Sequence, residues 1–284
     1  MTHKLPAYFF LAVIAVIPMI RVLPDQVRPM VQSALFRAFR NPGEKAILAP
    51  DGQLFYKPDV RYLVEPLDLS QPRAAIQDFR RQLVERNIRL IVVAVPVKAN
   101  LDQPAPASDI DLLPILRNRY LRYDTHWTCE GAQLAAQAVA DRLREFTGTT
   151  AYSSRPVTVD RKGDIVRMMD SPTLERYLPP EHVPCMEVQG YHDDPDSPIL
   201  VLGDSFLRIY QTDAPRNAGF IAHLAKELKT PLATIVNDGG ASTLVRQELA
   251  RRPQLLKNKK VVIWQFVERD LKFGIEGWQR VSVP

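Results

Sequence analysis

Apolar and polar positions along the chain alternate between short, continuously apolar runs and longer stretches with helical spacing. The apolar runs predict strands covered on both faces, and they occupy 89–95, 199–202, 232–236 and 260–267. Helical spacing predicts helices over 70–87, 129–146, 219–228 and 242–252. Because strands and helices alternate in this way, we expect an α/β fold with a mostly parallel sheet.

Two regions depart from that alternation. Before the first strand, the apolar spacing predicts a helix over 31–39 and a hairpin over 47–56 around an Asp-Gly turn. Residues 149–198 break the regular order, and we interpret them as an insertion with a hairpin around Lys162-Gly163. The expected organisation is a linker and helix over 24–45, followed by one catalytic domain over 46–284 that contains the insertion.

The N-terminal segment has the character of a targeting signal. Residues 5–20 carry no charge and lie between Lys4 and Arg21, a length between a signal-peptide core and a membrane-spanning helix. No small-x-small cleavage site follows, so residues 1–23 are expected to be an uncleaved signal anchor. A cleaved signal peptide and a buried core helix are the alternatives. Both export interpretations place the rest of the chain outside the cytoplasm.

Composition narrows the class of protein only slightly. In 284 residues, 46% are hydrophobic and 24% charged, which excludes a disordered chain and a polytopic membrane protein. The 37 Lys and Arg against 32 Asp and Glu give a net charge of +5. This mild and diffuse excess allows an acidic polysaccharide as partner, and it does not indicate nucleic acid.

The two cysteines, Cys129 and Cys185, form no metal-binding spacing, and we expect neither a metal nor a cofactor. An even number of cysteines in an oxidising compartment permits one disulfide. Two small buried thiols are an equally good interpretation.

The candidate catalytic residues lie where the predicted parallel strands end. The motif Gly203-Asp204-Ser205-Phe206 follows an apolar strand directly, and a serine at a sharp strand-to-helix turn exposes its hydroxyl at the sheet edge. Taken alone the motif is weak, because Gly, Asp and Ser are also ordinary loop residues.

A second motif supplies a base. Asp124 and His126 are two positions apart, so in an extended segment their side chains point the same way and the carboxylate can orient the imidazole. The alternative is a helix-capping Asp beside an uninvolved His. The chain has five histidines, and His126 is the one preceded by an acid at that spacing. With Ser205, the pair predicts a Ser-His-Asp triad.

The ordered motifs resemble the SGNH-like acetyltransferases of exopolysaccharide machinery, the family of the periplasmic alginate O-acetyltransferases. They are DGQLFYKP (51–58), DTHWT running into EGAQLAAQAVA (124–140), LGDSF (202–206) and VIWQFVERDL (262–271). Asp-x-His before Gly-Asp-Ser sets them apart from GDSL-type esterases, in which the serine comes first. The resemblance implies a three-layer sandwich with Ser205 as nucleophile, His126 as general base and Asp124 as its orienting acid.

The resemblance also implies a function. We expect a serine O-acetyltransferase that modifies hydroxyls of an exported polysaccharide and also hydrolyses model acetyl esters. It would be periplasmic, anchored in the inner membrane, and supplied with acetyl groups by a membrane-bound O-acyltransferase. We expect no carbohydrate-binding module after the catalytic domain, so the way in which polymer is held stays open. A polysaccharide deacetylase and an inactive scaffold or polysaccharide-binding subunit are the alternatives.

Oxyanion and substrate contacts are less certain from the sequence. A tetrahedral oxyanion needs hydrogen-bond donors, and the backbone N–H groups of Ser205, Gly219, Gly239 and Gly240 are candidates. Asn237 is a further candidate through its side-chain amide, although Asn-Asp-Gly-Gly is equally a plain turn. Arg269, after the last strand, either holds an acetyl donor or an anionic sugar, or pairs with Glu268 or another carboxylate.

Overall fold

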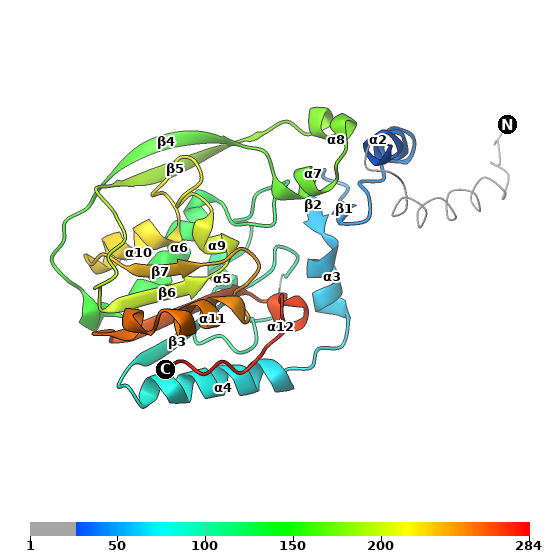
Figure 1. Cartoon of the computed structure of the whole chain (residues 1–284). Coiled ribbons are helices and arrows are strands. Elements are labelled where there is room, and N and C mark those ends of the chain that lie inside the picture. Colours follow the sequence, from blue (N-terminus) through cyan, green and yellow to red (C-terminus); the bar gives the residue numbers. More distant parts are fainter. Residues whose placement is uncertain (1–26, 101) are drawn as a thin grey trace, which may run out of the picture.

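A four-stranded parallel sheet forms the centre of the molecule (Figure 1). The computed structural model describes residues 27–284 except 101. The sheet order is β3 (Arg89–Val95), β8 (Val261–Val267), β6 (Ile199–Gly203) and β7 (Ala233–Val236), with every neighbouring pair parallel. The residues of β6 and β8 are buried throughout, because helices cover both faces. The predicted strands and the parallel sheet are confirmed.

Helices cover the sheet on both faces, as the alternating pattern predicted (Figure 1). One face carries α4 (Ser70–Val84) and α11 (Leu244–Arg251), and the other carries α6 (Cys129–Ala140) and α10 (Phe220–Leu228). The helix predicted to continue to 146 ends at Ala140 and is followed by a 3₁₀ turn, η2 (Arg144–Phe146). The three layers agree with the three-layer sandwich that the resemblance implied.

The insertion forms a long two-stranded ribbon over the α6 and α10 layer. Strand β4 (Ser153–Arg161) pairs antiparallel with β5 (Glu181–Gln189), and Arg161 lies opposite Glu181. The hairpin turn predicted at Lys162-Gly163 is wrong, because the strands are joined instead by two short helices, α7 (Asp164–Met168) and α8 (Pro172–Tyr177). Gly163 fits closely against the backbone of Tyr123, so this connection is packed against the segment that leads to Asp124.

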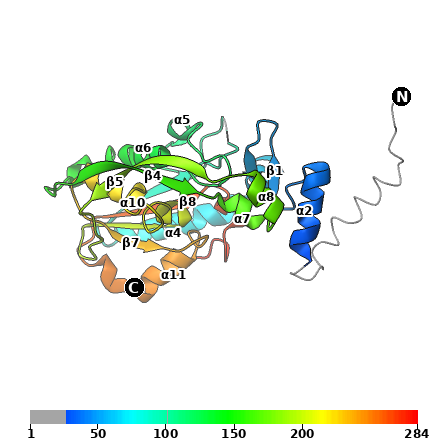
Figure 2. The ribbon, with the colours of Figure 1, turned by 90° about the horizontal axis from the view of Figure 1, so that it is seen from above.

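The N-terminal elements pack on the insertion (Figure 2). Helix α2 (Arg28–Phe39) lies against α8, and the predicted hairpin is present as β1 (Ala46–Leu48) and β2 (Leu54–Tyr56), followed by α3 (Lys57–Val64). Helix α2 and the β1–β2 hairpin share a small apolar core, separate from the main one, with α7 and α8. The remaining elements are α5 (Leu113–Leu116), α9 (Ser205–Arg208), η3 (Pro253–Leu256) and α12 (Asp270–Phe273).

None of the helices in the described part of the chain is long and apolar enough to cross a membrane. The signal anchor predicted for residues 1–23 lies outside the described residues.

Candidate active site

Ser205 begins helix α9 at the carboxyl end of β6, the strand-to-helix turn predicted from the sequence. Asp204 is the N-cap of that helix and is almost fully buried. Its carboxylate accepts hydrogen bonds from the backbone N–H groups of Phe206 (2.9 Å) and Val267 (3.0 Å) and from the Gln265 amide (3.1 Å). The nucleophile's turn is therefore fixed to the neighbouring strand β8 by a buried charged acceptor.

Gly203 is required just before this turn. A Cβ at this position would lie 2.4 Å from Oε1 of Gln265 and 2.5 Å from Cδ1 of Leu207. Only glycine allows β6 to approach β8 this closely while the chain turns to present Ser205.

His126 lies within hydrogen-bonding reach of the serine. Its Nε2 is 2.8 Å from Oγ of Ser205, and the Phe206 ring packs beside the imidazole with centroids 4.6 Å apart. The histidine precedes α6, whose N-cap Thr128 accepts from the Gly131 N–H. Although 79 positions separate them in the chain, the two side chains meet at one edge of the sheet.

Asp124 orients His126 from the opposite edge of the ring. Nδ1 of His126 donates to Oδ1 of Asp124 over 2.6 Å, and the same oxygen accepts the His126 backbone N–H at 3.0 Å. Both side chains are buried, Asp124 completely. Because Nδ1 donates to the carboxylate, Nε2 of the neutral ring is the acceptor that faces the Ser205 hydroxyl. The structure thus brings together the three residues of the predicted triad.

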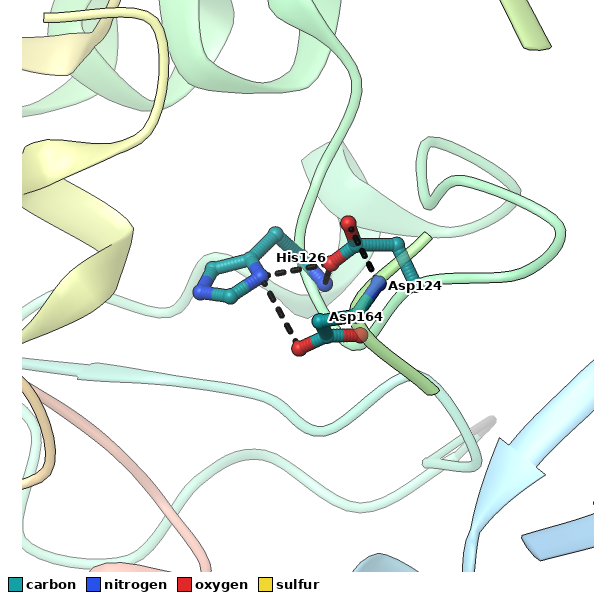
Figure 3. A group of neighbouring side chains, drawn as sticks. All are labelled: Asp124, His126 and Asp164. Carbon is teal, nitrogen blue, oxygen red and sulfur yellow. Dashed lines mark hydrogen bonds and ion pairs between the residues drawn. The ribbon is translucent and has the colours of Figure 1, made fainter. Parts of the chain in front are cut away.

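Two further residues, which the sequence did not reveal, complete this cluster. The second oxygen of Asp124, Oδ2, accepts hydrogen bonds from Nε of Arg161 and from the backbone N–H of Asp164, both at 3.1 Å. The Asp164 carboxylate approaches Nδ1 of His126 to 3.4 Å and accepts the Thr125 hydroxyl at 2.6 Å. Figure 3 shows the two carboxylates on one edge of the imidazole, with Nε2 on the far edge. Arg161 ends β4 and Asp164 begins α7, so both come from the insertion.

The cluster shifts the titration of the histidine. Burial by itself lowers the pKa of His126, but the charges and hydrogen bonds of Asp124 and Asp164 outweigh it and raise that pKa to about 9. Burial raises the pKa of Asp124, and the charges of His126 and Arg161 outweigh this and hold its pKa well below the usual range. Since an imidazolium cannot accept a proton, His126 becomes a competent base for Ser205 as the pH rises toward 9.

Asp124, His126 and Asp164 place one ligand atom each within 4.8 Å of one another, which suggests a metal site by distance alone. Their lone pairs are already used. Both oxygens of Asp124 accept N–H groups, and Asp164 accepts the N–H and hydroxyl of Thr125. The guanidinium of Arg161 at 3.1 Å also repels a cation. The donor set fits a proton relay better than a metal centre.

A cavity of about 500 Å³ opens beside Ser205 and His126. The insertion supplies one wall of it, including Arg161, Lys162 and Asp164. Further charged residues of both signs complete the lining, namely Asp160, Arg167, Arg208, Asp213 and Asp238. A reacting group bound against the serine therefore lies among charged hydrogen-bonding partners rather than in an apolar pocket.

The glycines predicted as oxyanion donors also have steric roles in the fold. Gly219, Gly239 and Gly240 are absent from the lining of this cavity. Gly219 is the N-cap of α10, where a Cβ would meet the Ile209 carbonyl at 2.5 Å. Gly239 has a left-handed backbone (φ +70°), and Gly240 leaves no room for a side chain against Asn237. Turn conformation and close packing account for glycine at these positions, and their role as oxyanion donors stays a prediction.

Asn237 and Arg269 also lie away from the Ser205 cavity. Asn237 lines a neighbouring cavity of about 680 Å³ that shares Arg208 and Asp238 with it. Arg269 is mostly buried and forms an ion pair with Asp59 at 3.0 Å. Of the two interpretations left open for Arg269, pairing with another carboxylate is therefore the one observed, and a contact with the substrate stays a prediction.

Cys129 and Cys185 are joined by a disulfide, with their Cα atoms 5.2 Å apart. Cys129 begins α6, three positions after His126, and Cys185 lies in the middle of β5. The bond therefore fastens the ribbon, whose other strand ends in Arg161, to the helix that follows the histidine.

Comparison with known proteins agrees with this geometry. Residues 103–268, more than half of the chain, match the family model described as SGNH hydrolase-like domain, acetyltransferase AlgX. The chain belongs to this family. The resemblance seen in the ordered sequence motifs is thereby confirmed, and the family's fold agrees with the parallel sheet and helix layers described above.

Relatives of the family are distant in sequence. The chain is 25% identical over 259 residues to the probable alginate O-acetylase AlgJ of Pseudomonas fluorescens, covering 75% of this chain and 64% of that protein. For the protein of the same name from Azotobacter vinelandii, the identity is 24% over 257 residues, covering 74% and 65%. The chain thus spans a little under two thirds of the length of these relatives.

Two solved structures share the fold. The O-acetyltransferase domain of Pseudomonas putida AlgJ has a TM-score of 0.63 at 22% identity, covering 80% of this chain and 92% of that one. Pseudomonas aeruginosa AlgX has a TM-score of 0.58 at 18% identity, covering 78% and 62%.

Proposed function

We propose that this protein is an SGNH-type serine O-acetyltransferase, which moves an acetyl group through Ser205 to a hydroxyl of an exported polysaccharide. The contact of 2.8 Å between Nε2 of His126 and Oγ of Ser205 carries the proposal, because a serine hydroxyl is inert until a base removes its proton. Membership of the AlgX family and the AlgJ relatives, named as alginate O-acetylases, support acetyl transfer as the reaction.

In the first half-reaction, Oγ of Ser205 attacks the carbonyl carbon of an acetyl ester while its proton passes to Nε2 of His126. The tetrahedral intermediate collapses by breaking the bond from the acyl carbon to the leaving oxygen, which takes the proton from the imidazolium. Asp124 stabilises that imidazolium from the Nδ1 side at 2.6 Å. The product is an acetyl-enzyme and a free alcohol.

The second half-reaction runs in the opposite sense. A sugar hydroxyl gives its proton to His126 and attacks the acetyl carbon, and the bond to Oγ of Ser205 breaks as the serine regains the proton. Water in place of the sugar gives hydrolysis by the same residues. Whether water or a sugar hydroxyl occupies the cavity therefore decides between hydrolysis and acetyl transfer. The charged wall of the cavity offers Arg161, Lys162 and Arg167 to the hydroxyls or carboxylates of a sugar.

The oxyanion of both intermediates needs donors. The backbone N–H of Ser205 is the first candidate, since the N–H groups of a first helical turn have no partner within the helix. Asn237 is retained as a second candidate donor, because its own N–H binds the Gly203 carbonyl, two residues before the serine.

The proposed setting is the periplasm, with residues 1–23 as an inner-membrane anchor. A membrane-bound O-acyltransferase that carries acetyl groups across the bilayer would be the donor protein, and a polysaccharide chain would be the acceptor. The uncharged run over residues 5–20 supports the export part of this proposal.

The acetyl-enzyme is the species that tests the proposal. After incubation of the full chain with an acetyl ester and rapid acid quenching, the peptide that contains Ser205 should gain roughly 42 Da, the mass of one acetyl group. The Ser205→Ala variant should show no gain. Ser153→Ala, which alters an exposed serine at the start of β4, should behave like the unaltered chain.

Acceptor specificity is measured next. Acetyl transfer from the same ester to an oligosaccharide in excess of hydrolysis supports a transferase, whereas hydrolysis alone at saturating acceptor identifies an esterase. Failure to form any acetyl-enzyme at pH 9, where about half of His126 is neutral, would contradict both activities and leave a scaffold as the remaining function.

A further inference from the structure

A second cavity, of about 600 Å³, lies apart from the one at Ser205. It is bounded by the β1–β2 hairpin, the residues after β3, helix α5 and the segment 117–122. The two cavities share no lining residue. They are nevertheless close along the chain, because Arg122, at the edge of this cavity, precedes Asp124 of the triad by two positions.

The charges around this second cavity are all of one sign. Lys98, Arg117 and Arg122 line it, and its described lining contains no aspartate or glutamate. The cavity at Ser205 differs in this respect, since carboxylates and cations alternate around it. A cavity that collects three cations without a carboxylate attracts an anion, and the attraction is strongest where water is excluded.

Lys98 is the buried member of this group, with only 7% of its surface exposed. Its ammonium donates to the carbonyls of Leu54 and Arg122, both at 2.7 Å, and lies 5.0 Å from the centre of the Phe55 ring. These bonds use two of its three N–H groups. Among the described residues, no carboxylate lies within ion-pair distance of it, and the charges of Glu181, Asp124, Asp164 and Asp59 favour its protonated form from farther away. A ligand carboxylate that reached it would therefore meet a buried cation with one N–H group left to donate.

The other walls suit a molecule with both an apolar and a hydroxylated face. Ile47, which is 39% exposed, and Phe55 form apolar surface. Gln53 and Asn118 carry amides, which both donate and accept hydrogen bonds. A pyranose ring offers C–H groups to the first kind of wall and hydroxyls to the second. A bare inorganic anion would use neither.

We propose that this cavity is a binding site for a carboxylate-bearing sugar residue of the acceptor polysaccharide, held by Lys98 and the arginines at positions 117 and 122. The proposal rests on the proposed function for the identity of the polymer. It adds a second binding site for that polymer, apart from the reacting serine. A chain bound there is retained between acetyl transfers, so neighbouring units can reach Ser205 in turn.

The binding test uses the full chain with Ser205→Ala, so that no acetyl chemistry takes place. Trigalacturonate is titrated by calorimetry against its fully methyl-esterified form, which keeps the sugar frame and removes the charge. Trigalacturonate should bind, and the ester should bind at least roughly tenfold more weakly. Glycerol phosphate, an anion without a sugar ring, should bind no better than the ester.

Three variants then locate the site. Lys98→Met should weaken trigalacturonate binding roughly 30-fold or more, because it removes a buried charge. Since that variant can also disturb folding, Arg117→Gln with Arg122→Gln provides a second test at exposed positions, with an expected loss of roughly threefold to tenfold. The matched control is Arg144→Gln, an arginine that is 79% exposed and pairs with Asp141 beyond the far end of α6. It should bind as before.

The pH dependence gives an independent readout. Burial lowers the pKa of Lys98 to about 8, an effect that the carboxylates of Glu181, Asp124, Asp164 and Asp59 partly offset. A bound carboxylate favours the protonated lysine, so affinity should be full well below pH 8 and fall as the pH rises through and above 8, toward the affinity of the Lys98→Met variant. In the Lys98→Met variant that fall should disappear.

Equal binding of the acid and its methyl ester would overturn the proposal, as would equal losses in the double variant and in Arg144→Gln. Tight binding of glycerol phosphate would leave an anion site but overturn the sugar assignment. None of these outcomes depends on the acetyl-enzyme, which is assayed separately in the unaltered chain. Failure of the sugar site and failure of the proposed function are therefore distinguishable.

Discussion

Arg161 forms an ion pair with Asp124 on the oxygen that does not bind His126. The guanidinium Nε donates to Oδ2 of the carboxylate at 3.1 Å, while the other oxygen receives the Nδ1 proton of His126 at 2.6 Å. Both ends of the carboxylate are thereby fixed, and the imidazole is aimed at Ser205. Arg161 ends a strand of the insertion, so the ribbon is part of the apparatus that orients the histidine.

Replacing Arg161 by Gln should lower kcat for acetyl-ester hydrolysis by about 10- to 100-fold, the usual cost of losing a residue that orients a reacting group. The pKa of Asp124 should rise, because a neighbouring positive charge that favours its ionised form is lost. Arg161→Lys should restore part of the rate, since it keeps the charge without the planar fork.

The control for this substitution lies on the same strand. Arg155→Gln removes an arginine that is 63% exposed and pairs with Glu187 across the ribbon. Steady-state rates of the three variants, with folding monitored by circular dichroism, separate the two roles. If Arg155→Gln and Arg161→Gln lose the same activity, the ribbon acts only through its stability.

Asp164 adds to the effect of Asp124 on the pH at which the histidine becomes a base. The pKa of His126 is raised to about 9, and Asp164 contributes to the rise by its charge and its hydrogen bond. The rate of acetyl-ester hydrolysis should therefore climb through a midpoint near pH 9. In Asp164→Asn the midpoint should move to lower pH, because one of the two carboxylates that stabilise the imidazolium is gone.

This shift is measured from rate against pH between 6 and 10, and from the His126 ring protons by NMR. The control is Asp141→Asn, a carboxylate that is 52% exposed and paired with Arg144. It should leave the midpoint in place. An unchanged midpoint in Asp164→Asn would show that Asp124 alone governs the titration.

The same raised pKa makes a prediction about stability. A histidine whose pKa is higher in the folded than in the unfolded chain stabilises the fold fully below its unfolded pKa of about 6.5, and this contribution is lost as the pH rises through about 9. The expected loss is about 3 kcal/mol for this buried group. Urea unfolding at pH 6 and pH 9.5 should show it in the unaltered chain and not in His126→Gln. Equal pH dependence in both proteins would assign the effect to other groups.

The two halves of the site differ in how visible they were in the sequence. Asp124 and His126 are two positions apart, so local extended geometry alone brings their side chains together. Ser205 was visible because an apolar strand precedes its turn. Arg161 and Asp164 reach Asp124 from 37 and 40 positions away, through a ribbon whose position depends on tertiary packing, so no spacing rule points to them.

The glycines illustrate a different ambiguity. A glycine N–H is a good oxyanion donor in principle, and that chemistry suggested Gly219, Gly239 and Gly240. The structure shows that a helix start beside the Ile209 carbonyl and a left-handed turn need glycine for steric reasons. Sequence alone cannot separate these demands, because both produce the same residue.

The disulfide should stabilise the ribbon in particular. Cys129 and Cys185 close a loop of 56 positions, and replacing both by alanine should lower the free energy of unfolding by about 2–4 kcal/mol. Hydrogen exchange should increase over β4 and β5, because the ribbon loses its covalent tie to α6. Dithiothreitol should produce the same change in the unaltered chain and none in the double variant. Unchanged exchange over the ribbon would mean that its packing on α6 and α10 holds it without the bond.

The buried carboxylate of Asp204 should be a main support of the nucleophile's turn. Asp204→Ala leaves the N–H groups of Phe206 and Val267 and the Gln265 amide without their acceptor, so we expect a loss of about 3 kcal/mol or more in unfolding free energy. Asp238→Ala is a matched comparison, since its carboxylate is 56% exposed and pairs with Arg208 at the surface, and it should cost about 1 kcal/mol or less. Urea titrations of both variants give the two values. Similar costs would show that the neighbouring strands, rather than the Asp204 carboxylate, hold Ser205 in place.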